Sequence, residues 1–267
     1  MNIAITGATG FLGEHLIEEL KIKNLSYSIF DRKKHDLFKP ETLKDLIEGK
    51  DIVIHLAGIN IGPYDKIMNV NVLGTLGLLD AMVKYSPNSK IIFASTFQVY
   101  VPHSLYGLSK KFAEEIINYY VFMHKIKALV FRLTNVYGEG CKPFYNSVIA
   151  TFIDQIKHKK PIFIYGDETR KRDYLYVEDT VDAIVKAVFF DPTNIEYFDI
   201  CSGKLISINK IVKILSEIYP NKIKIVYNKK VKVSDWGLKK NFIKANKLLK
   251  WKPQTLIEQG LKMAMQG

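Results

Sequence analysis

Tyr106 and Lys110 form a pair that could exchange protons with a substrate. They lie four positions apart in the segment YGLSK. If this segment opens a helix, both side chains share one face, and the ammonium can lie close to the phenol. A neighbouring cation lowers the pKa of a tyrosine from its ordinary value of about 10. The pair therefore suits chemistry on an alcohol or a ketone, although the same spacing also occurs by chance at exposed helix starts.

A glycine-rich segment near the N-terminus could bind a dinucleotide. The segment TGATGFLG places Gly7, Gly10 and Gly13 between a predicted strand and a predicted helix. Glycines here allow a tight turn, a close approach of the backbone to a pyrophosphate, and close packing of the helix on the strand. The free N–H groups at the start of the helix would then bind the anionic oxygens. We therefore expect a dinucleotide site at this turn.

The end of the next predicted strand bears on which dinucleotide is bound. Asp31 lies 24 residues after Gly7, where a carboxylate can accept hydrogen bonds from the adenosine ribose. Arg32 follows at once, with Lys33 and Lys34 after it. The carboxylate repels a 2′-phosphate, whereas a guanidinium can bind one. The sequence favours NAD and leaves NADP open.

The elements that must hold these residues follow from the hydrophobic pattern. Short apolar runs alternate with longer amphipathic stretches, which is typical of a parallel sheet with crossover helices. We expect strands at Asn2–Thr6, Tyr27–Phe30, Asp51–Ala57, Lys90–Ser95 and Lys127–Leu133, with helices at Phe11–Lys21, Pro40–Glu48, Tyr64–Tyr85 and Tyr106–His124. After about residue 138 glycines and a proline break the regularity, and Ile208–Ile218 and Phe242–Leu249 are expected to be short helices.

The predicted fold class is α/β. We expect a Rossmann-type, doubly wound parallel sheet with a smaller, partly discontinuous α/β lobe that binds the substrate. Residues 1–138, with returning segments near 174–200, would form the dinucleotide-binding domain. Residues 139–173 and 201–267 would form the smaller lobe.

Composition excludes several classes of protein. With 267 residues, of which 48% are apolar and 25% charged, the chain can bury a sizeable core. Cys141 and Cys201 lie too far apart for a metal motif and are too few for a disulfide framework, which favours a reducing compartment. The chain opens directly on the first strand, and no stretch reaches about 18 uninterrupted apolar residues. We expect a soluble, cytoplasmic protein without a membrane anchor.

The positive charge is concentrated in one segment. The net charge is +12, and Lys204 to Lys252 contains fourteen lysines but only Glu217 and Asp235 as acidic residues. Such a surplus fits a solvated surface, a site for a polyanionic small molecule, or a nucleic-acid surface. Nucleic acid is the least favoured of the three because the lysines are not interleaved with stacking aromatics.

Taken together, eight segments resemble the extended short-chain dehydrogenase/reductases. The resemblance is to the nucleotide-sugar epimerase/dehydratase branch typified by UDP-galactose 4-epimerase, and it covers nearly the whole chain. The segments are TGATGFLG at 6–13, HLAG at 55–58, NVLGT at 71–75, FASTFQVY at 93–100, YGLSK at 106–110, RLTNVYG at 132–138, IYGDETRKRDYLYVEDTVDAI at 164–184 and LLKWKP at 248–253.

This resemblance implies roles for particular residues. Tyr106 would transfer the proton, Lys110 would be its partner, and Thr96 would hydrogen-bond the reacting sugar oxygen. Asn135 and Arg172 would contact the substrate's diphosphate, and Tyr165 would face its base. The implied cofactor-binding residues are Gly7, Gly10, Phe11, Leu12, Gly13, Asp31, Arg32, Asp36, Leu37, Leu56, Ala57, Gly58, Asn71, Tyr106 and Lys110.

The same resemblance implies the ligands and the assembly. The cofactor would be NAD, with NADP possible, and the substrate a nucleotide-diphosphate sugar. A homodimer is implied by the long helices that start near residues 64 and 106. No metal, nucleic acid or membrane partner is expected.

Departures from the family pattern narrow the reaction. Phe97 and Gln98 stand where the 4,6-dehydratases of this branch carry an Asp-Glu pair, so epimerisation or reduction of a 4-keto sugar is favoured over dehydration. Asp199 and Cys201 replace an Asn and a Gly near the sugar-binding turn. A late arginine is missing, and Lys230 or Lys232 could substitute for it. A non-catalytic dinucleotide- or RNA-binding protein on the same fold is a third reading.

Overall fold

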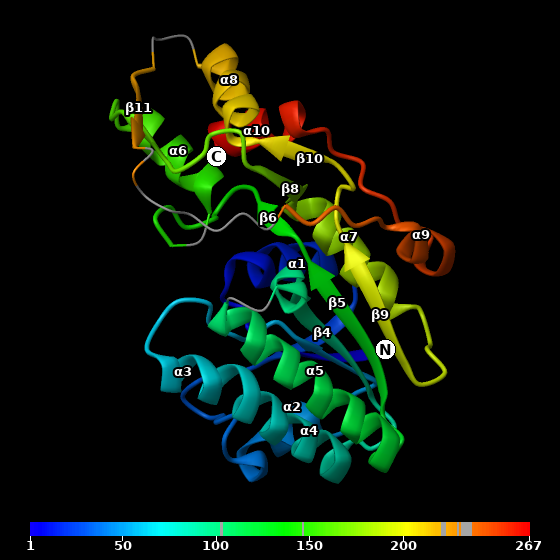
Figure 1. Cartoon of the computed structure of the whole chain (residues 1–267). Helices are drawn as coiled ribbons and strands as arrows, with labels where there is room; N and C mark the ends of the chain where they lie inside the picture. The colour runs from blue at the N-terminus through cyan, green and yellow to red at the C-terminus, as the bar shows by residue number, and fades with distance from the viewer. Residues whose placement is uncertain (102–103, 146, 220–222, 229, 231–236) are drawn as a thin grey trace.

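The larger part of the molecule is built on a six-stranded parallel sheet (Figure 1). The computed structural model describes residues 1–101, 104–145, 147–219, 223–228, 230 and 237–267. The strand order is β2 (Ser26–Ile29), β1 (Asn2–Thr6), β3 (Ile52–His55), β4 (Lys90–Thr96), β5 (Lys127–Leu133) and β9 (Ile195–Ile200). Because β2 and β3 lie on opposite sides of β1, the chain reverses its direction across the sheet at β1. This arrangement confirms the predicted Rossmann-type α/β fold.

Helices cover both faces of this sheet. One face carries α1 (Phe11–Ile22), α7 (Val177–Val188) and α9 (Ile243–Leu249), and the other carries α2 (Lys44–Ile47), α4 (Gly74–Tyr85) and α5 (Leu105–His124). Successive strand residues point to opposite faces. Ile92 therefore packs under α1 and α7, whereas Ile91 and Phe93 pack under α4 and α5. Burial on both sides explains the continuous apolar strands that the sequence shows.

The smaller lobe is assembled from later segments of the chain. It contains the sheet β10 (Leu205–Ser207), β8 (Lys171–Tyr176) and β6 (Asn135–Tyr137), and the pair β11 (Ile225–Asn228) and β7 (Ile162–Tyr165). Its helices are α6 (Val148–Lys157), α8 (Ile208–Ile218) and α10 (Ile257–Gln266), which share one apolar cluster with these strands. Figure 1 shows the lobe above the carboxyl ends of the large sheet.

The boundary between the two parts differs from the expected one. β8 pairs with β6 and β10 in the lobe, and the returning segment that packs on the large sheet is α7, which begins at Val177. The segment that includes α9 and Trp251 also packs on the large sheet, although it was expected in the lobe. Trp251 is fully buried there, and its indole N–H donates to the carbonyl of Asp179 at 2.9 Å. An indole that is both buried and hydrogen-bonded fixes this late segment to the larger part.

The helix predicted from Tyr64 to Tyr85 is interrupted. It consists of α3 (Tyr64–Met68), the π-helical turn η2 (Asn69–Leu73) and α4. Of the described residues, only this stretch is long and apolar enough to cross a membrane by length and composition. Half of its apolar window is buried inside the protein, as in a core helix. Two 3₁₀ turns, η1 (Pro40–Leu43) and η3 (Phe97–Tyr100), complete the connections.

Candidate active site

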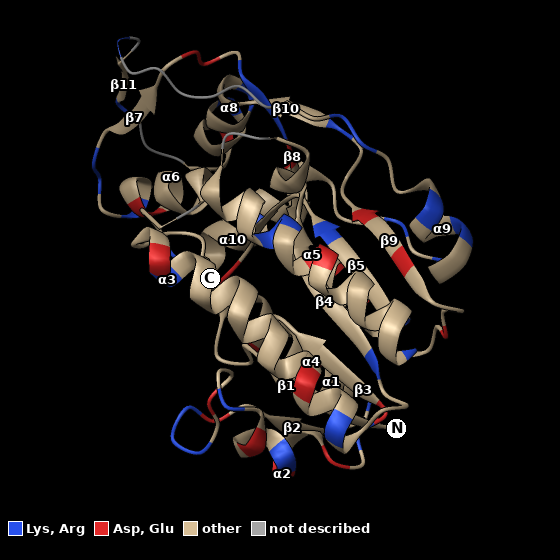
Figure 2. Ribbon diagram, turned by 60° about the horizontal axis from the view of Figure 1, so that its bottom comes forward, with Lys and Arg blue, Asp and Glu red and all other residues tan. Residues whose placement is uncertain are grey.

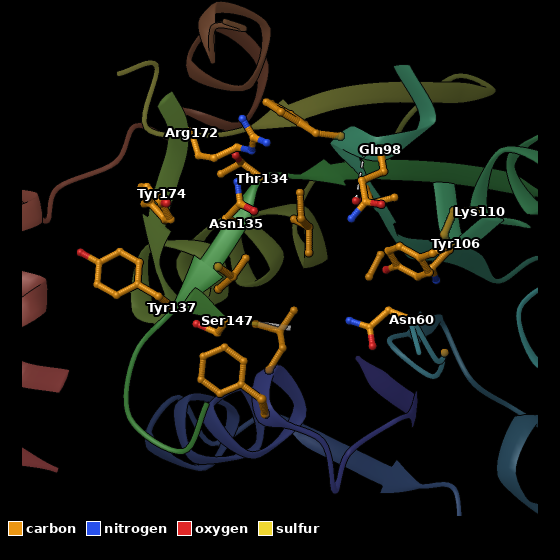
Figure 3. A pocket seen from close by; sticks show the side chains of 18 of the residues that line it. Asn60, Gln98, Tyr106, Lys110, Thr134, Asn135, Tyr137, Ser147, Arg172 and Tyr174 are labelled. Carbon is orange, nitrogen blue, oxygen red and sulfur yellow. Dashed lines mark hydrogen bonds between the residues drawn. The ribbon is translucent and has the colours of Figure 1, made fainter. Parts of the chain in front are cut away.

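A cavity of about 560 Å³ lies between the carboxyl ends of the large sheet and the smaller lobe (Figure 3). Open parallel sheets bind their ligands at this edge, where the strand order reverses. The wall comes from the β1–α1 turn, the loop after β3, the end of β4, the start of α5, and the strands β6 and β8. Of the residues predicted for the site, the wall contains Phe11, Leu12, Leu56, Gly58, Thr96, Tyr106, Lys110, Asn135 and Arg172.

The glycine turn has the geometry of a phosphate cradle. Gly7 has a φ of +78°, which a residue with a side chain rarely adopts. A Cβ on Gly13 would lie 2.2 Å from the carbonyl oxygen of Gly7, so only glycine lets α1 pack this closely on the turn. Gly10 is the N-cap of α1, and no side chain caps the helix start. The amides of the first turn are therefore available to an anion.

The loop after β2 lies outside the cavity wall. Asp31 follows β2, the neighbour of β1, and its carboxylate accepts a hydrogen bond from the N–H of Lys33 at 2.9 Å. Arg32 is exposed. The carboxylate of Asp36 accepts a hydrogen bond from the N–H of Phe38, two residues further on. Leu37 is buried against α4. These residues form a separate patch on the same sheet edge as the glycine turn, so an extended ligand is needed to contact both.

Asn71 lies behind the wall. It sits in η2 and is 1% exposed. Its amide accepts the N–H of Ile59 at 2.9 Å and donates to the carbonyl of Ile59 and to Ser109 Oγ. These bonds tie the loop that carries Leu56, Ala57 and Gly58 to helix α5. Ala57 is not in the wall, although the residues on either side of it are.

Tyr106 and Lys110 lie together at one end of the cavity (Figure 3). Ser104 caps α5 by accepting the N–H of Gly107 at 3.1 Å. Lys110 is 2% exposed, and its Nζ lies 4.4 Å from the centroid of the Phe93 ring. Burial lowers the pKa of Lys110 to about 7, and the charge of Glu114 opposes that shift.

The expected lowering of the pKa of Tyr106 is not found in the protein alone. Burial raises this pKa, and Tyr145 adds to the increase. The phenolate is the charged form, so removal from water disfavours it. Burial disfavours the charged form of Lys110 as well, so the ammonium that would lower the pKa of the phenol is itself less populated.

Thr96 lies at the same end, where β4 turns into η3. Its Oγ1 accepts the N–H of Gln98 at 3.2 Å. The Oε1 atom of Gln98 accepts a hydrogen bond from Ser104 Oγ at 2.5 Å, which links this turn to the start of α5. Phe97 is 2% exposed. Neither Phe97 nor Gln98 offers a carboxylate at this turn.

Polar residues of the smaller lobe occupy the other end of the cavity. Asn135 donates to the carbonyl of Asp173 at 2.8 Å, which places it at the junction of β6 and β8. Arg172 lies on β8 and lines the same end (Figure 3). The hydroxyl of Tyr174 is buried and has no hydrogen-bond partner among the residues that the structure describes. A buried unpaired hydroxyl in a cavity wall fits a site that a polar ligand completes.

Tyr165 does not reach the cavity, contrary to the prediction. It is 48% exposed on β7 and stacks on Phe163 at a centroid distance of 6.5 Å. The alternation of β7 explains this position, because Ile162 and Ile164 point inward and the two aromatic residues point outward. Tyr174, Arg170 and Tyr145 line the cavity instead, and the sequence reasoning missed them. For Tyr174 a signal was available, because residues two apart on a strand point to the same face and Arg172 was already expected at the site.

The other residues that depart from the family pattern are not found in the cavity wall. Asp199 accepts a hydrogen bond from Tyr100 at 2.8 Å, and Cys201 is fully buried. Lys230 is not in the wall, and Lys232 lies outside the described residues. Within the described part of the chain, no three His, Cys, Asp or Glu residues group as a metal site.

The fold and the site define a dinucleotide-dependent enzyme of the short-chain dehydrogenase/reductase type. Residues 3–196 match the NAD dependent epimerase/dehydratase family, and the chain belongs to this family. Among curated proteins, it is 31% identical to a putative UDP-glucose 4-epimerase of Methanocaldococcus jannaschii, over 97% of this chain and 96% of that protein. It is 27% identical to the GDP-6-deoxy-D-mannose reductase of Pseudomonas aeruginosa, over 97% and 94%.

A solved structure agrees with this placement. The UDP-glucose 4-epimerase of Thermotoga maritima, crystallised with UDP-glucose, superimposes with a TM-score of 0.88 at 26% identity. The match covers 100% of this chain and 98% of that one. The likeness therefore includes the smaller lobe as well as the sheet.

Proposed function

We propose that the protein is an NAD(P)-dependent nucleotide-sugar epimerase that inverts a sugar carbon, namely C4. The observation that carries the proposal is the cavity itself (Figure 3). Thr96, Tyr106 and Lys110 lie at one end, and Asn135 and Arg172 lie at the other. The first group suits proton exchange with a hydroxyl, and the second suits a diphosphate. The epimerase relatives at 31% and 26% identity support the same reading.

The residues of the glycine turn fit a dinucleotide. The close packing of α1 on the turn, which a Cβ on Gly13 would prevent, and the uncapped start of α1 are suited to a pyrophosphate. Asp31 would hold the adenosine ribose, and its carboxylate favours NAD over NADP. The cofactor would supply a hydride acceptor beside the sugar carbon. Gly7, Gly10, Leu12 and the backbone of Leu56–Gly58 would line its path.

The chain's own residues would move the proton and orient the sugar. Tyr106 would act from its phenolate form, which a charged Lys110 and an oxidised nicotinamide would favour. The phenolate would take the proton of the sugar hydroxyl, and the resulting phenol would return it to the ketone oxygen, while Thr96 would hold that oxygen by a hydrogen bond. Lys110 would support the phenolate when it forms. Arg172 and Asn135 would anchor the diphosphate, so that the sugar alone turns between the two half-reactions.

The proposal is tested by product analysis. The purified protein is incubated with a panel of nucleotide-activated hexoses and their 4-keto derivatives, and products are read by NMR and by absorbance of reduced nicotinamide. An epimerase interconverts two sugars with no net change in that absorbance. Consumption of reduced cofactor with a 4-keto sugar would replace the proposal by a reductase. Dinucleotide binding without turnover across the panel would favour a non-catalytic protein.

We further propose that the protein acts as a cytoplasmic homodimer without a nucleic-acid partner. An apolar groove on the surface of α4 and α5 supports the dimer, since it is lined by Val72, Leu76, Phe112, Ile116 and Tyr119. Against a nucleic-acid surface, the basic residues of the late segment are spread over α9 and separate loops (Figure 2).

A further inference from the structure

A buried carboxylate lies on the face of α5 that carries the proton-transfer pair. Glu114 follows Lys110 by four residues, as Lys110 follows Tyr106, so the three side chains share one side of the helix. The Glu114 side chain is 0% exposed. A buried charge costs free energy unless partners compensate for it.

Both oxygens of Glu114 are engaged. Oε1 accepts hydrogen bonds from Ser95 Oγ at 2.6 Å and from Arg132 Nε at 3.0 Å. Oε2 accepts a hydrogen bond from Arg132 Nη2 at 2.6 Å. The arginine therefore holds the carboxylate with two parallel bonds, which fixes both partners in orientation.

Arg132 extends this network to the far side of the Thr96 turn. Its Nη1 donates to the hydroxyl of Tyr100 at 2.8 Å, and that hydroxyl donates to Asp199 at 2.8 Å. The guanidinium carbon lies 4.8 Å from the Tyr100 ring centroid and 4.7 Å from that of Tyr197. Ser95 and Tyr100 flank the turn that contains Thr96 and Gln98. The turn is thus linked to Glu114 at both ends, directly through Ser95 and through Arg132 at Tyr100.

The charges around Lys110 make Glu114 its main electrostatic partner. On α5, Tyr106 is neutral because burial raises the pKa of its phenol. From β3, His55 is neutral because burial lowers its pKa to about 3. Two cations pair with Glu114 itself, since Arg132 of β5 lies 2.6 Å and Lys111 of α5 lies 3.8 Å from its Oε2. Glu114 alone opposes the effect of burial on the pKa of Lys110.

We propose that Glu114 is a positioning residue of the epimerase site. It fixes the Thr96 turn against α5 and holds the Lys110 amine in its charged form. The expected effect of Glu114 on catalysis rests on the proposed function. Its effect on the charge of Lys110 does not depend on any substrate.

The electrostatic part is tested without substrate. Lysine labelled with ¹³C at Cε is titrated by NMR, and Lys110→Met identifies the Lys110 signal. Glu114→Gln should lower the midpoint of that signal below the wild-type value, because the negative charge is lost while the shape is kept. Glu19→Gln, a helical glutamate of α1 paired with Lys23, should leave the midpoint unchanged. An unchanged midpoint in Glu114→Gln would overturn the proposal, whatever the enzyme's substrate.

The catalytic part is tested on the substrate found with the sugar panel. The Lys110 charge is lost as pH rises through its pKa, so a lower pKa moves the alkaline limb of the kcat profile to lower pH. Glu114→Gln should lower kcat about ten- to a hundredfold and move this limb. Glu114→Asp should keep the limb in place because the charge remains. A lower kcat with an unmoved limb in Glu114→Gln would indicate a purely structural role.

The contact with the Thr96 turn is tested separately by Ser95→Ala. This variant removes one hydrogen bond to Glu114 and no charge. It should lower kcat and leave the alkaline limb unmoved. If Glu114→Gln does not fold, Ser95→Ala still tests whether Glu114 positions the Thr96 turn. An unaltered kcat in Ser95→Ala would contradict that role.

Discussion

At the scale of single residues, burial decides how the proton-transfer pair behaves. Burial favours the uncharged forms of both groups, raising the pKa of Tyr106 and lowering that of Lys110 to about 7. The spacing of YGLSK predicted which residues meet, because helix periodicity is local. It could not predict their protonation, which depends on how much water the smaller lobe excludes.

Tyr106→Phe removes the only group proposed to exchange the substrate proton. We expect kcat to fall by about 10²- to 10⁴-fold, because the ring still packs but has no exchangeable proton. Dinucleotide affinity should remain close to that of the wild type. Turnover and dinucleotide titration measure the two effects. Tyr64→Phe is the matched control, since Tyr64 is 80% exposed. Full activity in Tyr106→Phe would refute the proposed role.

Gly13→Ala tests the cradle at the start of α1. The added Cβ would lie 2.2 Å from the carbonyl oxygen of Gly7 and 2.7 Å from the backbone of Ala8, so the turn must shift. We expect a loss of about 1–3 kcal/mol in the free energy of unfolding and weaker dinucleotide binding. Gly74→Ala is the control, because its nearest neighbour would be a leucine side chain at 3.5 Å. Equal dinucleotide affinity in the two variants would argue against the cradle.

At the scale of elements, the sequence predicted the first half of the chain and the helices α8 and α9 well, but it missed the strands of the second half. The strand Asn2–Thr6 is both predicted and observed, and the strand at Lys90 is observed one residue longer than predicted, because buried parallel strands are continuous apolar runs. The strands of the smaller lobe were missed. β6 and β10 have three residues each, too few for an alternating pattern to be recognised. Tyr165 lies on β7, which has only four residues and was not predicted as a strand, so the outward direction of its side chain could not be predicted.

His15 on α1 connects the larger part to the smaller lobe. Its Nδ1 lies 2.6 Å from a carboxylate oxygen of Glu178, and its Nε2 lies 3.0 Å from the carbonyl oxygen of Glu139. The hydrogen bond to Glu178 is the main cause that raises the pKa of His15 to about 9. A raised folded-state pKa stabilises the protein below the unfolded value of about 6.5. That contribution is lost as pH rises through 9.

His15→Gln should therefore destabilise the protein in a pH-dependent way. Below about pH 6.5 we expect the variant to be less stable by about 1–2 kcal/mol, since a charge-assisted hydrogen bond is lost. The difference should shrink as pH rises towards 9 and above. Urea unfolding at several pH values measures it. His158→Gln, at an exposed histidine of α6, should show little change. A difference independent of pH would contradict a charged His15.

At the scale of the whole molecule, the order of segments along the chain conceals how the two parts are built. The smaller lobe is formed from segments on both sides of α7 and β9, and the segment containing Trp251 returns to the large sheet afterwards. Hydrophobic pattern identifies a buried face, but not which of two sheets it covers. The net charge likewise does not indicate a binding partner, because the Lys and Arg residues lie on many separate elements (Figure 2).

The assembly should depend on the outer surface of α4 and α5. Phe112 is 45% exposed and Tyr119 is 56% exposed beside an apolar groove, and apolar side chains grouped in this way on a surface indicate an interaction site. A two-fold pairing of this face would bury the groove of each protomer against the same helices of its partner. Phe112→Glu places a charge at the groove, where burial without a partner is costly.

We therefore expect wild-type protein to sediment as a dimer and Phe112→Glu as a monomer with an unchanged circular dichroism spectrum. Analytical ultracentrifugation over a range of concentrations measures the shift. Phe189→Glu is the matched control, because Phe189 is 60% exposed at the end of α7, on the opposite side of the sheet. A monomeric wild type, or a Phe112→Glu variant that stays dimeric, would show that this face does not form the dimer. Because Tyr106 and Lys110 lie on the other side of α5, monomerisation should change turnover far less than Tyr106→Phe does.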